Sequence, residues 1–254
     1  MFIEPLSGYT DDPDDVYPEG LFDLFASSGN LSIAAGGNPS DAEGKHKIFL
    51  LFAIVSKWLL RPSREEPTLA ILESLPLWKT PIAVLQVRRT DKMTEDPYWL
   101  SHGHNYRELA DYGSAVTEIE NEVDLKFGGV FVLSDTQRAI DQLLKDRMGN
   151  GLREDLPILY DPGVNRSAIE TYGHASIPSV EVKKDLQDHF VAELYTAASM
   201  ADYAVGTISS NIFRFLGQCI AARKRVTQIS AKGPAYWSLD IGVGSRSEDD
   251  AWDP

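Results

Sequence analysis

Short apolar runs, separated by polar turns and helical segments, recur along the last two thirds of this chain. The runs cover residues 82–87, 130–133, 158–160, 203–205 and 226–229. Their length is typical of buried strands, and each is followed by a polar turn and a segment with helical character. Strands that alternate with helices predict a parallel sheet, so we expect an α/β fold of the Rossmann-like type.

Two of the intervening segments have a helical period. Residues 137–147 carry Ile140, Leu143 and Leu144 on one face and stop at Gly149-Asn150, and residues 211–224 show a similar apolar face. Both patterns predict amphipathic crossover helices.

The first 80 residues have a different pattern. Residues 1–45 are rich in Gly, Pro, Asp and Ser, which predicts little regular structure there. Residues 48–60 are apolar almost all round and end at Arg61-Pro62, where the proline prevents a helix from continuing, and a second helix is expected over residues 66–75. We therefore expect two domains, residues 1–80 and residues 81–254.

The composition limits the partners of the chain. A formal net charge of −14 in 254 residues excludes an extended nucleic-acid surface, because an acidic body repels phosphates. Any phosphate-bearing ligand must then meet a local cluster of positive charge. The longest apolar run, residues 48–55, is far shorter than the roughly 20 residues that cross a bilayer, so we expect no membrane-spanning segment.

Polar turns after the expected strands are the first place to look for a site, because ligands of open parallel sheets bind outside the carboxyl ends of the strands. The three turns are Arg-Arg-Thr-Asp-Lys at residues 88–92, Ser-Asp-Thr at residues 134–136 and Thr-Ile-Ser-Ser-Asn at residues 207–211. Arginine clamps phosphate oxygens, and the start of a helix is an anion site. A solvated charge cluster and an ordinary serine cap are the alternatives, but the combination at one sheet edge favours diphosphate recognition.

These segments and their order resemble the α-1,6-fucosyltransferase family, which includes the core fucosyltransferases of N-glycans and the rhizobial nodulation fucosyltransferases. The resemblance rests on residues 87–92 (Val-Arg-Arg-Thr-Asp-Lys), 132–135 (Val-Leu-Ser-Asp) and 201–211 (Ala-Asp-Tyr-Ala-Val-Gly-Thr-Ile-Ser-Ser-Asn). Residues 57–62 and 237–240 are similar in kind, so the resemblance covers roughly residues 47–240.

The resemblance implies a fold and an activity. The expected enzyme is an inverting GT-B-type glycosyltransferase that moves fucose from GDP-fucose to a glycan hydroxyl and requires no metal or other cofactor. Residues 81–254 would form the nucleotide-sugar-binding domain. Residues 1–80 would be a partial, mainly helical acceptor-side domain, as in an N-terminally truncated member. A role in protein glycosylation in the Golgi is implied by the same resemblance.

The resemblance also implies residue roles. Arg88 would hold the donor diphosphate, where a fixed cation stabilises the charge that develops on the leaving oxygen, and Arg89 would brace its loop. The other positions that it assigns to the donor side are Gln86, Asp135, Glu193, Ser209, Ser210 and Asn211.

Glu95 is the candidate base for the acceptor hydroxyl, with Lys92 as its partner. The family places a glutamate shortly after the lysine of the motif, one residue further on than here, and an exposed loop glutamate is the alternative. Tyr112 resembles an acceptor-side tyrosine of the family, with core packing as the alternative.

Two positions depart from the family pattern. Gln86 stands where the family has a histidine, and Glu193 lies one position away from a family aspartate, and both family residues help to recognise guanine. Glutamine and glutamate still hydrogen-bond a base edge, so recognition would be retuned rather than abolished. The departures leave open a non-catalytic nucleotide-sugar-binding module or an inactive truncated homologue. An α/β interaction protein whose Arg–Asp pairs only brace the sheet is a third possibility.

Other motifs add little. His102 and His104 flank Gly103 and are interpreted as surface histidines rather than metal ligands. The tripeptide at residues 165–167, Asn-Arg-Ser, matches a glycosylation acceptor pattern but does not decide localisation. Cys219, the single cysteine, lies among apolar residues and is interpreted as core.

Overall fold

The structure is a computed structural model that describes residues 72–73, 78, 80–90, 107–173, 176–207, 210–224 and 235–239. All of these belong to one compact unit, which spans residues 52–253. Most of residues 1–80 lie outside the described part, so the expected division into two domains stays a prediction.

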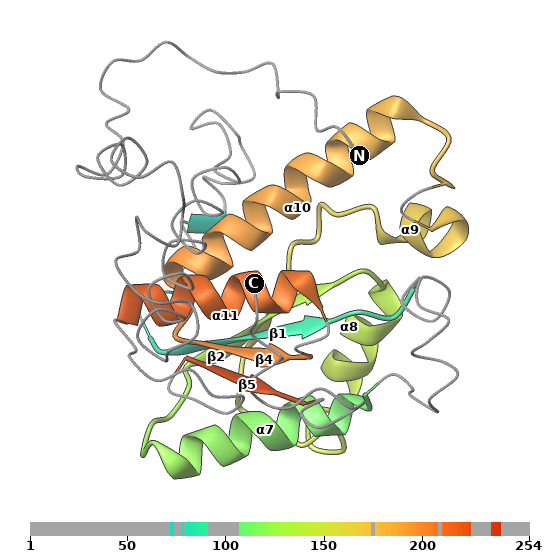
Figure 1. The fold of residues 1–254 in the computed structure, drawn as a ribbon. Helices are drawn as coiled ribbons and strands as arrows, with labels where there is room; N and C mark the ends of the chain where they lie inside the picture. Colours follow the sequence, from blue (N-terminus) through green and yellow to red (C-terminus); the bar gives the residue numbers. More distant parts are fainter. Residues whose placement is uncertain are drawn as a thin grey trace, which may run out of the picture. The chain divides into compact units, whose positions relative to one another are not determined.

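The described chain is built from five strands and five longer helices (Figure 1). In chain order they are β1 (Ile82–Val87), α7 (Leu109–Glu122), β2 (Gly129–Ser134), α8 (Gln137–Lys145), β3 (Ile158–Leu159), α9 (Arg166–Tyr172), α10 (Val180–Met200), β4 (Tyr203–Gly206), α11 (Asn211–Lys224) and β5 (Tyr236–Ser238).

The five strands form one parallel sheet in the order β3-β2-β1-β4-β5. The expected α/β fold with a parallel sheet is therefore confirmed. This order is shared with the first five strands of doubly wound dinucleotide-binding sheets, in which the strand order reverses between β1 and β4. In such sheets the loops that leave the two strands at the reversal diverge, which leaves room for a ligand at the carboxyl edge.

Helices cover both faces of the sheet, which is why its strands are apolar without alternation. Helices α7 and α8 pack on one face, where Ala83, Leu85 and Val87 of β1 join their core cluster. Helices α10 and α11 lie across the sheet from α7 (Figure 1). Because side chains alternate along a strand, Gln86 points away from the α7 face and toward α10 and α11.

The sequence pattern located most strands and two helices. The strands expected at residues 82–87, 130–133 and 203–205 are confirmed as β1, β2 and β4, and β3 is one residue shorter than expected. The helix expected at residues 211–224 is α11, and α8 stops two residues before the expected end. The strand expected at residues 226–229 lies outside the described residues, whereas β5 was not expected.

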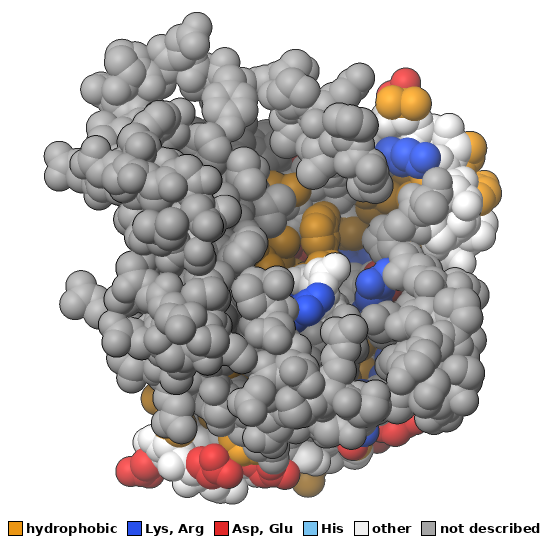
Figure 2. Space-filling model, in the orientation of Figure 1, with side chains coloured by type: hydrophobic (Ala, Val, Ile, Leu, Met, Phe, Trp, Pro, Cys, Tyr) orange, Lys and Arg blue, Asp and Glu red, His pale blue; other side chains and the backbone are white. Residues whose placement is uncertain are grey.

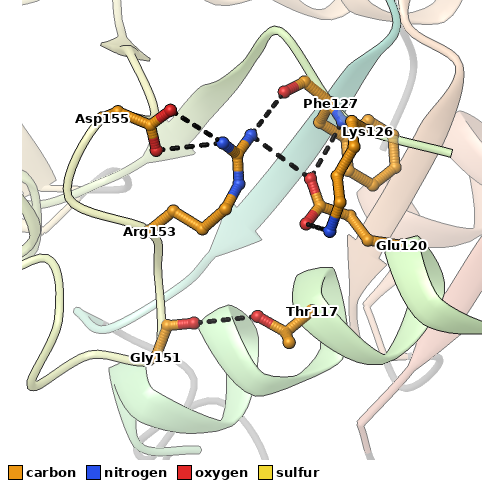
Figure 3. A network of polar contacts seen from close by, with 7 residues as sticks. All are labelled: Thr117, Glu120, Lys126, Phe127, Gly151, Arg153 and Asp155. Atoms are coloured by element: carbon orange, nitrogen blue, oxygen red, sulfur yellow. Dashed lines mark hydrogen bonds and ion pairs between the residues drawn. The ribbon is translucent and has the colours of Figure 1, made fainter.

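A network around Glu120 fixes the entry to β2 on the α7 side (Figure 3). Glu120 is 3% exposed, and its carboxylate accepts hydrogen bonds from the backbone N–H of Phe127 at 2.9 Å and from Lys126 at 3.1 Å. Arg153 lies 3.4 Å from the same carboxylate and donates to the carbonyl of Phe127 at 2.8 Å. The network ties α7 to the segments that lead into β2 and β3.

Candidate functional site

The loops after β1 and β2 lie side by side at the carboxyl edge of the sheet. Val87 is the register partner of Ser134, so Arg88 and Asp135 follow at the same level. The Asp135 carboxylate accepts hydrogen bonds from the backbone N–H groups of Arg89 at 2.8 Å and Thr90 at 3.1 Å, and from the Thr90 hydroxyl at 2.7 Å. Asp135 therefore has a positioning role, because it holds the loop that follows Arg88.

A cavity of about 380 Å³ opens at this edge, on the α10 side of the sheet. It lies between the ends of β1 and β2, one face of α10 and the first turn of α11. Its walls are mainly apolar with a few polar groups, as is usual for small-molecule sites. The lining residues from the strand ends and α11 are Gln86, Val87, Arg88, Leu133, Ser134, Asp135 and Ile212, and the others are Val164, Ile169, Ile177, Lys183, Leu186, Gln187, Phe190 and Glu193.

Gln86 is the polar side chain that β1 supplies to the cavity. Its side chain is buried, with 4% exposed, and Oε1 has no hydrogen-bond partner among the described residues. An unsatisfied buried acceptor costs roughly 1–3 kcal/mol, so folded proteins rarely keep one without use. A ligand that places an N–H group in this cavity would remove that cost.

Glu193 of α10 is the second buried polar group of the wall, at 4% exposed. The pKa of this carboxyl group is raised to about 8, mainly by burial and in smaller part by the Asp161 charge. The Arg166 charge and a backbone hydrogen bond from Asp161 act in the opposite direction. The protonated carboxyl is thus favoured near neutral pH when the cavity holds no ligand.

Arg166, at the first residue of α9, is the cation closest to Glu193. It is 2% exposed, and its Nη2 lies 3.3 Å from Glu193 Oε1. Nε donates to the carbonyl of Ser134 at 3.0 Å, and Nη1 donates to the carbonyl of Asp161 at 2.6 Å. The guanidinium also lies over the ring of Tyr160, 5.6 Å from its centre. One arginine therefore ties the ends of β2 and β3 to α10.

Asp161, whose carbonyl accepts from Arg166, also contacts a histidine through its carboxylate. Its Oδ2 lies 2.6 Å from His189 Nδ1, and its Oδ1 accepts the backbone N–H of Gly163 at 2.8 Å. His189 comes from α10, one turn before Glu193. The Asp161 carboxylate is thereby fixed between its own turn and α10, beside the Arg166 guanidinium.

Positive charge reaches the cavity from two elements. Arg88 follows β1 and Lys183 lies in the first turn of α10, and both line the cavity. Figure 2 shows Lys or Arg side chains beside hydrophobic ones in the hollow at the centre of the view, and acidic side chains along the lower edge. The local cluster of cations that an acidic chain needs for a phosphate ligand is therefore present at the sheet edge.

The N-terminal end of α11 is the remaining part of the expected diphosphate cradle. The Ser210 hydroxyl is 3.5 Å from the backbone N–H of Phe213, so it occupies the position of a helix cap. Asn211 begins the helix, and its side-chain oxygen accepts a hydrogen bond from Arg214. Ser209 lies outside the described residues. Ile212 in the same turn reaches the cavity, which brings this helix start next to β1.

Of the remaining expected residues, the structure describes only Tyr112, and it does not line the cavity. Tyr112 is 3% exposed and packs in the core cluster of α7 and α8, on the other face of the sheet. This is the position that the core-packing alternative predicts. Lys92 and Glu95 lie outside the described residues, so their assignment as catalytic pair stays a prediction.

Three residues of the site were missed from the sequence: Arg166, Asp161 and Lys183. Asp161 had a usable signal, because it follows β3 by two residues and belongs to the class of polar residues after strands. Arg166 had no such signal, because it is the middle residue of the glycosylation-like tripeptide at residues 165–167 and its partners come from distant segments.

No protein-family model matches this chain, and a search of curated proteins found no match. The resemblance to the α-1,6-fucosyltransferase family stays a prediction. In the described ranges no helix is both long and apolar enough to cross a membrane. Across the same residues, no group of His, Cys, Asp or Glu side chains is arranged to hold a metal ion.

Proposed function

We propose that the cavity binds the nucleotide part of a nucleotide sugar, and that the chain is an inverting glycosyltransferase of the GT-B type that uses GDP-fucose as donor. The observation that carries this proposal is that Gln86 Oε1, buried and without a hydrogen-bond partner among the described residues, and the buried Glu193 line the same cavity. Two buried polar groups with apolar neighbours suit the edge of a nucleobase, which is flat, apolar on its faces and polar along its rim.

Guanine fits the polar groups on chemical grounds. Its N1–H and 2-amino group are adjacent donors, and the wall offers the Gln86 carbonyl oxygen and the Glu193 carboxyl group as acceptors. Phe190, Leu186 and Ile169 give the apolar surface against which a base can pack. This agrees with the part that the resemblance gives to the positions of Gln86 and Glu193.

The diphosphate would lie at the sheet edge, between Arg88 and the start of α11. Arg88 leaves β1 into a loop that Asp135 holds with three hydrogen bonds, so its position is set before a ligand binds. The first N–H groups of α11 and the helix dipole favour an anion at the same place. Sugar transfer leaves negative charge on the departing diphosphate, and these fixed groups would stabilise it in the transition state.

A non-catalytic nucleotide-sugar-binding module is the second candidate. The observation in its favour is that the described site residues account for ligand binding alone. Gln86 and Glu193 would bind the base, Arg88 would bind the diphosphate and Asp135 positions its loop, whereas none of them is assigned as the base for an acceptor hydroxyl. The proposed enzyme needs Glu95 for that step. Sugar transfer from GDP-fucose that depends on Glu95 would support the enzyme, and saturable GDP binding without transfer or donor hydrolysis would favour the module.

The first test is calorimetric titration of the purified chain with GDP, ADP and UDP. Selective binding of GDP is expected, with a loss of at least about tenfold in affinity in Arg88→Ala, because a charge-assisted contact to phosphate is worth roughly 1.5–3 kcal/mol. Arg138→Ala, an exposed arginine of α8 on the other face of the sheet, serves as the control. Absence of GDP binding in the wild-type protein would contradict the proposal.

A further inference from the structure

We propose that Arg166 is the positioning residue of the base site, fixing the Glu193 carboxyl group in the cavity wall and allowing it to ionise when a base with two N–H donors binds. The inference rests on the proposed function and extends it to a residue outside the cavity lining. It also predicts a consequence that plain packing would not give, namely that nucleotide binding releases a proton through Glu193.

The geometry of Arg166 supports a positioning role. Its guanidinium donates to two backbone carbonyls, of Ser134 at 3.0 Å and of Asp161 at 2.6 Å, which belong to the ends of two strands. These two bonds fix the plane of the guanidinium independently of the ligand. The third contact, from Nη2 to Glu193 Oε1 at 3.3 Å, then fixes the carboxyl group at the end of its flexible side chain.

The charges around Glu193 determine how easily it ionises. Two charged side chains act on Glu193 directly, namely Arg166 of α9 and Asp161 in the turn after β3. Three more line the same cavity, namely Arg88 after β1, Asp135 after β2 and Lys183 of α10, while the lining residue of α11 is the uncharged Ile212. Asp161 is paired with His189 at 2.6 Å and opposes ionisation of Glu193. Arg166 is the cation in direct contact, so it offsets the cost of a second buried carboxylate.

The proton balance follows from the chemistry of the base. A protonated carboxyl group donates one hydrogen bond, whereas guanine presents N1–H and 2-amino donors that need acceptors. Oε1 of Glu193 accepts from Arg166, so a proton on this carboxyl group would sit on Oε2, the oxygen left for guanine. We expect this proton to pass to solvent as guanine binds, which lets Oε2 accept a guanine N–H. GDP affinity should rise with pH by up to about tenfold per pH unit below the pKa of the unliganded carboxyl group and level off above it.

The test measures GDP dissociation constants by calorimetry between about pH 6.5 and about pH 8.5, the range in which Glu193 should titrate. Repeating the titrations in buffers with different heats of ionisation gives the number of protons released on binding. The wild-type protein should release close to one proton at the acidic end. In Arg166→Gln the affinity should still rise steeply at the alkaline end of this range, where the wild-type affinity begins to level off, because loss of a close opposite charge raises a carboxyl pKa by about one to three units. Arg153→Gln is the matched control, since Arg153 also pairs with a buried glutamate, and its pH profile should equal that of the wild type.

Two further variants keep the test valid if Arg166→Gln folds poorly. Glu193→Gln should lose the pH dependence that the wild-type protein shows beyond the titration of the GDP phosphates themselves. Arg166→Lys keeps the charge but not the planar fork, so it should bind GDP more weakly at each pH while the midpoint of the profile stays near that of the wild type.

The outcomes separate this inference from the proposed function. No GDP binding by the wild-type protein at any pH would overturn both. GDP binding with the same pH profile in the wild type, Arg166→Gln and Glu193→Gln would leave the base site standing and overturn the role of Arg166. Wild-type affinity and midpoint in Arg166→Lys would also overturn it, because the fork geometry would then be dispensable.

Discussion

Two buried glutamates, one on each face of the sheet, pair with an arginine in different ways. Both carboxylate oxygens of Glu120 accept hydrogen bonds, from Lys126 and from the backbone N–H of Phe127, and Arg153 forms an ion pair with the same carboxylate (Figure 3). These contacts tie α7 to the lead-in of β2. Glu193 has one arginine contact at 3.3 Å, a backbone hydrogen bond from Asp161 and a raised pKa. It lines a cavity together with Gln86, whose Oε1 has no hydrogen-bond partner among the described residues. The Glu120 carboxylate has its partners within the fold, although Arg153 Nε in the same network is buried without a hydrogen-bond partner among the described residues. Glu193 and Gln86 differ because they line a cavity that a ligand can enter.

The comparison matters because a buried Glu–Arg pair is by itself weak evidence for either stability or function. What separates the two here is the surrounding structure. Glu120 has a backbone N–H and two cations as donors and joins elements that are close in space. Glu193 lies at the carboxyl edge, where open parallel sheets bind ligands, and it shares a cavity wall with a cation after β1.

The largest expected effect is a difference in stability between two matched substitutions. Glu120→Gln replaces one carboxylate oxygen with an amide that faces cations, and it should lower the free energy of unfolding by about 2 kcal/mol, because hydrogen bonds to a buried charged group are weakened. Glu193→Gln should instead raise the free energy of unfolding at pH 7, because the unfolded wild-type chain gains free energy by ionising Glu193 and the glutamine variant does not. Urea unfolding at pH 7 measures both, and equal losses would contradict the comparison.

The pH dependence of stability tests the same contrast without a ligand. The pKa of Glu193 is about 8 in the folded chain, above its ordinary value of 4.5, so its stabilising contribution is present below pH 4.5 and is lost as pH rises through 8. Between these values the unfolding free energy of the wild type should fall relative to that of Glu193→Gln, by at most about 1.4 kcal/mol per pH unit. Urea unfolding of both proteins from about pH 5 to about pH 8, the range in which this group titrates, gives the dependence of the unfolding free energy on pH. Parallel curves would mean that Glu193 is ionised throughout.

Gln86→Met should act on stability and binding in opposite directions. The substitution removes a buried acceptor that has no partner among the described residues and keeps the side-chain volume, so the unliganded chain should gain about 1 kcal/mol. GDP binding should weaken about tenfold or more, because the base loses a hydrogen bond. Thermal unfolding and calorimetric titration of the same preparation measure the two effects. A less stable variant with unchanged GDP affinity would show that Gln86 serves the core.

The smallest expected effect concerns Lys126. Its side chain is 69% exposed although it contacts Glu120 at 3.1 Å, so Lys126→Ala should change the free energy of unfolding by about 0–1 kcal/mol. Urea unfolding of Lys126→Ala and Glu120→Gln under the same conditions shows whether the stability of the network depends mainly on the buried Glu120. A loss of similar size in both variants would place the energy in the ion pair rather than in the burial of Glu120.

Much of the fold could be predicted from the sequence, because buried parallel strands are short uninterrupted apolar runs. Residues 82–87 and 130–133 have that pattern, and the rule that ligands bind at strand carboxyl ends then selected Arg88 and Asp135. β5 was missed because Tyr236–Ser238 is too short to stand out from the loop around it.

Less of the site could be predicted, because its decisive contacts join distant segments. Arg166 meets Ser134, 32 positions earlier, and Glu193, 27 positions later, and no local pattern records either contact. The sequence placed Asp135 among the donor-binding residues, whereas its carboxylate accepts three bonds from the loop at Arg89 and Thr90. Residue type and position predict which groups reach the sheet edge, but side-chain packing decides whether a group binds or positions.

The most direct test of the central claim is an experimental structure of the chain with GDP bound. The account predicts the guanine in the cavity, with its edge within hydrogen-bonding distance of Gln86 and Glu193, and the diphosphate beside Arg88 and the start of α11. GDP bound elsewhere, or a base turned away from Gln86 and Glu193 while the phosphates remain at Arg88, would contradict it.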